Sequence, residues 1–501
     1  MADDEKTVLA LHEHAEQPGA ACTAAEDPSG SLVARRKMER RLVWKQDVTI
    51  LPLLAMCFFF SYVDRGQIGN ARLMGLQKDL HLSASQYYNA LLVFFIGYMV
   101  IELPCCLGLM YVKPGHQFGF ATIAFGVLAT CIAACKTYGS LIAIRFLLGL
   151  SEAFVQVGFL YLSLWYRHDE IALRCALFYV SGPLAGAVSG LIAYGVAKNL
   201  NEAHGIASWR WLFIVEGIPT ITWGILVFFA LPSRPEVIAE KGTWLFSDRT
   251  ERELILERTV AAKNTAHAKF VPRQVLLALT DVKAYLDALI VAAFGLGVAA
   301  FGLFMPTFIN EFGFSPLHTQ LFTMIPYACA AIALPIICTV ADRFTMRAMP
   351  ILFCYILCLA GFILLLVTTQ KAARIVGTCL VSAGSYPGVI LAATWVMSTH
   401  GGYTKRSTTW AMCQLLIQCY SILGTKIYDK PPRFFKGHGI LLGLQTLAAV
   451  CVMLKWWMMW RGNRQKDALK EEYDGREEPI PGLEESIEVL NDRHPGFKYL
   501  L

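Results

Sequence analysis

The chain has 501 residues, of which 55% are hydrophobic and only 16% are charged, and its formal net charge is +6. Soluble proteins carry roughly 25% charged residues. The composition therefore excludes a soluble globular protein of this size, a disordered chain and a nucleic-acid-binding protein. Nearly all of the 15 cysteines lie in apolar segments without zinc or disulfide spacing, so we expect no metal and no cofactor.

Residues 1–47 are hydrophilic and are predicted to form a disordered N-terminal tail. A helix needs roughly 20 apolar residues to cross a bilayer, and twelve later segments meet this requirement. They lie at residues 48–68, 87–111, 117–135, 139–165, 174–197, 209–231, 284–308, 319–341, 348–368, 373–397, 407–427 and 438–460. The sequence thus predicts an all-α membrane protein with twelve transmembrane helices.

The twelve segments divide into two six-helix halves, residues 48–231 and 283–460. This layout is typical of transporters built from two related halves. The connector, residues 232–282, is charged and has helical apolar spacing, which favours an amphipathic helix over a flexible tether. Residues 461–501 form a second hydrophilic tail.

Lys and Arg near the span ends predict the orientation. Basic residues gather before the first span and in the connector, so both termini and the connector are expected to be cytoplasmic. Only the loop 428–437 departs from this pattern. We expect a monomeric multi-pass protein, whose partner is the lipid bilayer and whose location is the plasma membrane.

Charged residues inside the predicted spans are the main functional signal. The first span contains Asp64 and Arg65, and the fourth contains Arg145 and Glu152. A charge at a helix centre costs about 2.5–3.5 kcal/mol on insertion scales, so such residues are retained for function or for pairing. We therefore expect these four to face one another and an internal cavity.

Helical geometry constrains how the four can meet. Arg145 and Glu152 lie roughly two turns apart on one helix face, whereas Asp64 and Arg65 diverge by about 100°. One residue of the first span can thus pair with the fourth while the other faces substrate. The alternative is a set of purely structural salt bridges. Two further acids in the spans are interpreted as structural. Glu102 lies just before a proline, and Glu216 is expected to pair with Arg210 or a neighbouring helix.

Polar and aromatic residues in the second half are candidates for the other side of the cavity. They are Tyr386, Trp395, Gln418 and Tyr420. The alternative is that these side chains face lipid or pack between helices, as most aromatic residues in spans do.

Several motifs resemble those of a known family. Residues 61–71 and 145–153 resemble the first and fourth spans of the anion:cation symporter family of the major facilitator superfamily. Shorter motifs resemble the fungal allantoate permease branch, which includes transporters of nicotinate and other carboxylates: residues 208–219, 402–407, 428–429, 437–438 and 493–499. The chain departs from that branch at Thr399 and at residues 417–420, where bulkier groups reshape the second half.

The resemblance implies roles for individual residues. Asp64 and Glu152 would be proton-coupling sites, and Arg65 and Arg145 would bind an anionic substrate. The superfamily's gating motif survives in Asp342, Arg343 and Arg347, between the eighth and ninth spans. The simpler interpretation of these three charges is that they set topology.

We therefore predict proton-coupled uptake of a small organic anion, a carboxylate or vitamin-like compound, by alternating access. One alternative is an exporter of a secondary metabolite on the same fold. An alternative of another class is a nutrient sensor that has lost transport. The sequence has no nucleotide-binding loop and no catalytic constellation, so we do not expect an enzyme.

Overall fold

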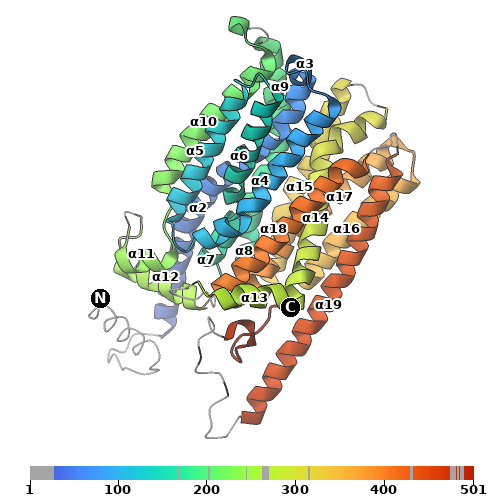
Figure 1. Cartoon of the computed structure of the whole chain (residues 1–501). Helices are drawn as coiled ribbons and strands as arrows, with labels where there is room; N and C mark the ends of the chain where they lie inside the picture. Colours follow the sequence, from blue (N-terminus) through green and yellow to red (C-terminus); the bar gives the residue numbers. More distant parts are fainter. Residues whose placement is uncertain are drawn as a thin grey trace. The chain divides into compact units, whose positions relative to one another are not determined.

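The computed structural model describes residues 28–167, 169–200, 203–243, 245–261, 270–313, 316–428, 433–473, 481, 485 and 490–501. Within these residues every regular element is a helix (Figure 1). The described residues up to 45 belong to one compact unit and residues 46–501 to another. Apart from the start of the helix Pro28–Leu73, the helices discussed below lie in the second unit. The structure confirms the predicted all-α fold class.

The first half consists of long helices joined by short connections. Two predicted spans are each split into two helices, at Val157 and at Val180. The helices are α2 (Pro28–Leu73), α3 (Leu76–Asp79), α4 (Ala84–Gly108), α5 (Pro114–Ile132), α6 (Tyr138–Gln156), α7 (Gly158–Trp165), α8 (Ile171–Tyr179), α9 (Ser181–Asn199) and α10 (Ser208–Ala230), with a 3₁₀ turn at Ala203–Gly205.

The connector contains three short helices, α11 (Pro235–Lys241), α12 (Arg249–Ala261) and α13 (Pro272–Thr280). The buried residues of α12 lie at helical spacing, so one face of this helix is covered: Glu251, Leu254, Ile255, Arg258 and Thr259. Because three of the five are polar, the amphipathic helix of the connector stays a prediction. The second half consists of α14 (Val282–Glu311), α15 (Pro316–Arg343), α16 (Ala348–Val367), α17 (Lys371–Thr399), α18 (Tyr403–Ile427) and α19 (Phe435–Tyr473).

Eleven helices in the described part of the chain are long and apolar enough to cross a membrane. The predicted segment 407–427 forms α18, which is 25 residues long but does not reach that apolarity. Its buried face carries polar side chains such as Thr408, Gln414 and Gln418. With α18 as the twelfth long helix, the architecture agrees with the predicted two sets of six.

The N-terminal tail differs from its prediction. Helix α2 begins at Pro28, so residues 28–47 are helical rather than disordered. This stretch contains many Arg, Lys, Glu, Met and Leu residues, which are strong helix formers. The earlier part of the predicted tail, residues 1–27, lies outside the described residues.

Close helix packing holds the first half together. Helix α4 packs on α6, and α5 packs on α10, which run side by side in Figure 1. A Cβ on Gly149 would lie 2.1 Å from the Phe94 carbonyl oxygen, and one on Gly97 would lie 2.3 Å from the Phe146 carbonyl oxygen. These glycines let α4 and α6 touch at the level of Arg145 and Glu152.

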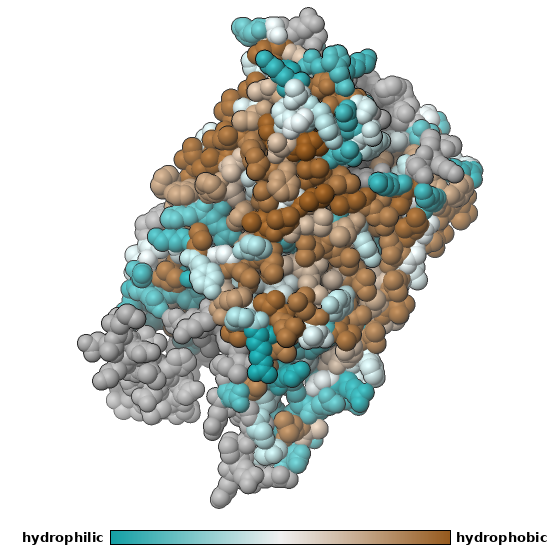
Figure 2. Space-filling view, in the orientation of Figure 1, coloured by the Kyte–Doolittle hydropathy of each residue, from teal (hydrophilic) through white to brown (hydrophobic). Residues whose placement is uncertain are grey.

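The two halves also contact each other directly. Helix α4 packs on α18, and α15 packs on α8 and α9. The Tyr403 hydroxyl at the start of α18 donates to the Cys106 carbonyl oxygen of α4 at 2.8 Å. In Figure 2 hydrophobic residues cover much of the visible helical surface, and hydrophilic residues gather toward its ends. This distribution fits a protein whose middle zone faces lipid.

The described end of the chain, residues 490–501, packs against the second half. The Trp395 indole nitrogen donates to the Leu500 carbonyl oxygen at 2.9 Å. Asn463 on α19 bonds the Tyr499 backbone twice, at 2.9 and 2.8 Å. Because of these contacts we call residues 490–501 the docked segment. The sequence had predicted only a hydrophilic tail there.

Candidate functional site

Helices α2 and α6 bring the four predicted charges together in two crossed pairs. The Arg65 Nε lies 2.9 Å from the Glu152 Oε2, and the Arg145 Nη1 lies 3.8 Å from the Asp64 Oδ2. Both residues of α2 therefore pair with α6. The sequence had allowed only one of them to do so, with the other facing substrate.

Three of these four side chains are almost fully shielded. Asp64 and Arg145 side chains are each 2% exposed and Glu152 is 0% exposed, whereas the Arg65 side chain is 23% exposed. Buried ion pairs are costly to desolvate and need extra hydrogen bonds to offset that cost. Arg65 is thus the most accessible member of the cluster.

The hydrogen bonds of this cluster are incomplete among the described residues. Both oxygens of Asp64, one oxygen of Glu152, two nitrogens of Arg145 and one nitrogen of Arg65 are buried without a hydrogen-bond partner. Buried polar atoms are normally satisfied, so exceptions need an explanation. Open guanidinium N–H groups and open carboxylate oxygens are the groups that would bind an anion and protons.

A hydroxyl that sequence analysis missed supports one of the pairs. Ser61 lies one helical turn before Arg65 on α2, and its Oγ donates to the Glu152 Oε2 at 2.6 Å. The signal was available, because residues four apart share a helix face. Ser61 and Arg65 thus hold the same carboxylate oxygen from one side.

Aromatic rings surround the exposed guanidinium. The Arg65 Cζ lies 5.4 Å from the Tyr62 ring centroid, 5.5 Å from that of Phe94 and 5.2 Å from that of Tyr98. The hydroxyls of Tyr62 and Tyr179 are 3.1 Å apart. Cation–π contacts hold a guanidinium in place, and the same rings offer apolar faces to the organic part of a solute.

The predicted residues of the second half are not gathered at one place. Tyr386 on α17 lies closest to the aromatic group, with its ring centroid 6.1 Å from that of Tyr179. On α18, Gln418 is buried and Tyr420 is partly exposed. Trp395 has contacts away from the aromatic group. Its indole N–H donates to the docked segment, and the Lys455 ammonium lies 3.7 Å from its ring centroid.

The predicted gating residues lie where the two halves meet. Asp342, at the end of α15, accepts hydrogen bonds from the backbone N–H groups of Ala172 and Leu173 at 3.2 and 2.8 Å. These residues lie at the N-terminus of α8 in the first half, where the helix dipole also stabilises a carboxylate. The Arg347 Nη2 donates to the Asp342 Oδ1 at 2.7 Å, whereas Arg343 is exposed.

Glu216 was predicted to pair with Arg210 or with a neighbouring helix, and the first of these alternatives is wrong. Arg210 bonds Asp79 at 3.0 Å and the Ala133 carbonyl oxygen at 2.6 Å, so it is not the partner of Glu216. The prediction rested on closeness in sequence, but residues six apart on a helix do not share a face. Glu216 instead lies in the electrostatic field of Asp64, Glu152 and Arg145.

The second half contains a charge network that sequence analysis did not identify. Asp287 on α14 bonds the Lys455 ammonium through Oδ1 and the His400 Nε2, at 2.9 Å, through Oδ2. Next to it, Asp492 of the docked segment bonds Lys405 at 2.6 Å and also bonds Lys283. All four oxygens of these two aspartates have partners.

The charge of Asp492 is strongly stabilised. Burial opposes its ionisation, but the nearby ammonium groups of Lys283 and Lys405 outweigh burial and hold the pKa of this carboxyl well below its ordinary value. The same two lysines lower the pKa of Asp281 against the opposing effect of its burial. Asp492 and Asp281 therefore stay ionised at physiological pH.

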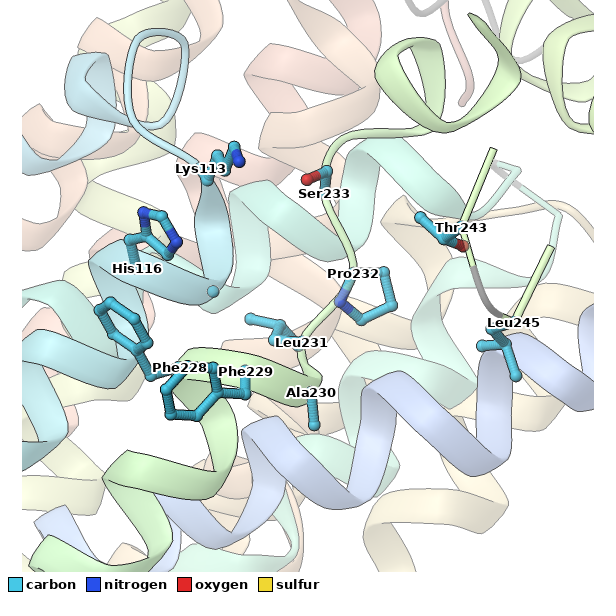
Figure 3. Close-up of a pocket in the computed structure, with 11 residues that line it drawn as sticks. Lys113, His116, Phe228, Phe229, Ala230, Leu231, Pro232, Ser233, Thr243 and Leu245 are labelled. Carbon is cyan, nitrogen blue, oxygen red and sulfur yellow. The ribbon is translucent and has the colours of Figure 1, made fainter. Parts of the chain in front are cut away.

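A separate pocket of about 200 Å³ lies between the start of α5, the end of α10 and the connector (Figure 3). Lys113, His116, Ser233 and Thr243 line it together with apolar side chains such as Phe228. The His116 ring stacks on that of Phe228, with centroids 4.5 Å apart. None of the predicted site residues lines this pocket, and we assign it no role.

Long membrane-type helices in two sets, with incompletely satisfied charges buried between them, define a polytopic membrane transporter. Residues 54–404 match the sequence profile of the Major Facilitator Superfamily. A high-affinity nicotinic acid transporter of Saccharomyces cerevisiae is 31% identical over 483 residues, covering 95% of this chain and 87% of that protein. An uncharacterised transporter of Schizosaccharomyces pombe is 30% identical over 448 residues, or 89% and 91% of the two chains.

Solved structures agree on the fold. The proton:xylose symporter XylE matches with a TM-score of 0.66 at 12% identity, covering 83% of this chain and 95% of XylE. The chain belongs to the Major Facilitator Superfamily. It is a multi-pass membrane transporter and not an enzyme.

Proposed function

We propose that the protein takes up a small organic carboxylate together with protons, by alternating access. The observation that carries this proposal is the pair of arginines, Arg145, which is buried, and Arg65, which is partly exposed, because both guanidinium groups keep buried nitrogens without a hydrogen-bond partner among the described residues. Guanidinium groups bind carboxylates in a planar, often bidentate geometry. The nicotinic acid transporter of yeast supports this substrate class, and we place the chain in the anion:cation symporter family, in its allantoate permease branch.

Each arginine already has a carboxylate partner, and this explains how protons would be coupled. Arg65 is held by Glu152 and Arg145 by Asp64. A proton on Glu152 or Asp64 removes the competing charge, so that the arginine is free to bind the substrate carboxylate. Proton and anion binding then favour each other, as symport requires.

The rings around Arg65 would contact the organic part of the substrate. Tyr62, Phe94 and Tyr98 supply flat apolar faces beside the guanidinium. Across the halves, the Tyr386 ring lies beside that of Tyr179. Gln418 and Tyr420 on α18 complete the proposed site, whereas Trp395 is left out because its N–H is used by the docked segment. Asp342 and Arg347 would open and close the contact with α8.

We also propose that the protein works in the plasma membrane as a monomer, with both termini in the cytoplasm. The excess of Lys and Arg before the first span and in the connector supports this orientation. Uptake in intact cells compared with release from preloaded cells distinguishes import from export.

Binding of radiolabelled nicotinate to the purified protein tests the anion site. Arg145→Ala and Arg65→Ala each remove charge-assisted hydrogen bonds, so we expect a loss of affinity of about 10- to 100-fold. Arg249→Ala, at a surface position where the side chain is 83% exposed, is the matched control and should bind normally. Unchanged nicotinate affinity in both site variants would contradict the assignment of the arginines.

A further inference from the structure

Glu216 on α10 is a third buried acid beside the charge cluster. The residue is 5% exposed. Both of its carboxylate oxygens are buried, and neither has a hydrogen-bond partner among the described residues. Asp64 and Glu152 differ from it, because each of them has an arginine within salt-bridge distance.

The packing of α10 fixes the position of this carboxyl group. A Cβ on the next residue, Gly217, would lie 2.0 Å from the Thr130 Oγ1 of α5, so the two helices touch here. Six residues earlier on the same helix, Arg210 bonds Asp79 and the Ala133 carbonyl oxygen. These contacts between α10 and its neighbours therefore fix where the backbone of Glu216 lies.

Charges reach Glu216 from α2 and α6. Asp64 and Glu152 repel its ionised form, and Arg145 attracts it. Helix α5, which packs along α10, offers the uncharged Gly126 and Thr130 at this level. Of the charged groups that face Glu216, a single one is cationic, and that one is already paired with Asp64.

Acidic side chains outnumber basic ones in and beside the charge cluster. Glu102 on α4 is also 0% exposed, and the sole hydrogen-bond contact found for it in the described structure is the Cys106 thiol, at 3.9 Å. Four acids thus accompany two arginines, Arg65 and Arg145. Full ionisation would leave two uncompensated negative charges in a low-dielectric interior, and buried groups in this situation take up protons instead.

We propose that Glu216 carries a proton in this conformation and is a further proton-coupling residue of the transporter. It alternates with the substrate carboxylate as a partner of Arg145. In the step, the O–H bond of the Glu216 carboxylic acid breaks and the proton passes to water on the side to which the site is open. The remaining carboxylate then pairs with Arg145, which keeps its charge throughout.

This assignment rests on the proposed anion site at Arg145 and makes its coupling more specific. An ionised Glu216 competes with the substrate for Arg145, and a protonated Glu216 does not. Substrate affinity should therefore fall as pH rises through the range in which Glu216 of the free protein loses its proton, even if Asp64 and Glu152 remain ionised. Release of the proton would in turn promote release of the anion.

Infrared spectroscopy of the purified protein in lipid nanodiscs tests the proton on Glu216 without any substrate. A protonated carboxylic acid has a C=O stretching band that a carboxylate lacks and that shifts in heavy water. At neutral pH, Glu216→Gln should lose one such band, because glutamine has the shape of the protonated acid but no carboxyl group. Glu253→Gln, at an exposed residue paired with Arg249, should leave the bands unchanged.

Two results would overturn the proposal. The first is an intact protonated-carboxyl region in Glu216→Gln with loss of a carboxylate band, which would show that Glu216 is ionised. The second comes from nicotinate binding measured over a pH series. One coupled proton changes affinity about tenfold per pH unit above the pH at which the group loses its proton. The pH series is therefore extended into the alkaline range where wild-type affinity falls, and there Glu216→Gln should lower the slope of log affinity against pH by about one. An unchanged slope in that range contradicts the coupling role.

The two measurements separate this inference from the proposed function. If the wild-type protein does not bind nicotinate, the proposed function loses its support, while the infrared spectrum still reports whether Glu216 holds a proton. Glu216→Asp keeps a titratable group and should restore part of the pH slope. A merely structural role for Glu216 would not produce that recovery.

Discussion

The two halves of the molecule bury charge in opposite ways. In the first half, Asp64 and Arg145 approach no closer than 3.8 Å and several of their polar atoms have no partner in the described chain. In the second half, both oxygens of Asp287 are bonded, to Lys455 and to His400. Burial is similar in the two places, so the difference lies in how fully each charge is satisfied.

This difference indicates what each set of charges does. A fully satisfied buried network rigidifies its surroundings and resists change. A partly satisfied one retains binding capacity at a cost in stability. We therefore expect substitutions in the first half to affect transport most and substitutions in the second half to affect stability most.

The largest functional effect is expected for Glu152→Gln. Glutamine keeps the shape of the protonated side chain but does not titrate, so proton-driven accumulation of nicotinate in proteoliposomes should be abolished while exchange remains measurable. Thermal stability should change little. Accumulation against a pH gradient by this variant would show that Glu152 is not a coupling residue.

The largest effect on stability is expected for Lys455→Ala. It leaves the buried charge of Asp287 without its ammonium partner, which costs about 3–5 kcal/mol in comparable buried pairs. Thermal unfolding in detergent measures the loss, and exposed Lys470→Ala is the control. Nicotinate affinity of the folded fraction should stay within a factor of a few, and a selective loss of binding would end the division between the halves.

A smaller effect is expected at Asp492, which fixes the docked segment to Lys283 and Lys405. Because the pKa of Asp492 is lowered in the folded protein, the stabilisation is fully present above the ordinary pKa of an aspartate, about 4, and is lost as pH falls below it. The protection factors of the amides of residues 490–501, which compare their exchange rates with the intrinsic rates of an unfolded chain at the same pH, should therefore be constant between about pH 5 and pH 8.

Asp492→Asn removes the charge at every pH. We expect faster exchange in the docked segment by an amount that corresponds to about 1.5–3 kcal/mol. Asp467→Asn, which removes an exposed pair with Lys498, is the control. Equal protection of residues 490–501 in the Asp492 variant and the wild type would show that these contacts do not hold the segment.

The smallest effect is expected for Ser61→Ala. It removes one hydrogen bond to Glu152 but leaves the Arg65 pair, so a loss of about 1 kcal/mol in unfolding free energy is expected. Accumulation of nicotinate should persist. A complete loss of accumulation would place Ser61 in the coupling step itself.

The sequence predicted most of the fold because apolar length determines which helices cross a membrane. It also predicted that Asp64, Arg65, Arg145 and Glu152 would meet, because isolated buried charges are too costly to leave apart. Their crossed pairing depends on the relative rotation of α2 and α6, which local spacing does not contain.

Other features depend on contacts that no local pattern reveals. The docked segment lies against residues such as Lys283 and Trp395, which are more than a hundred positions away in the chain. Trp395 was predicted to line the substrate site, because the sequence alone does not distinguish an aromatic residue that faces a cavity from one that packs between helices. For Glu216 the sequence left open a pair with Arg210 or with a neighbouring helix, and the helix turns Arg210 and Glu216 to different faces.

The polar character of α18 has a consequence for how the protein is made. Helices enter the bilayer from the translocon according to their own apolarity, and polar residues at the centre of a helix oppose insertion. Because α18 lies below the apolarity of the other long helices and packs along α14 and α4, it needs partners that are already in place. We therefore expect α18 to be retained in the bilayer through its contacts with α14 and α4.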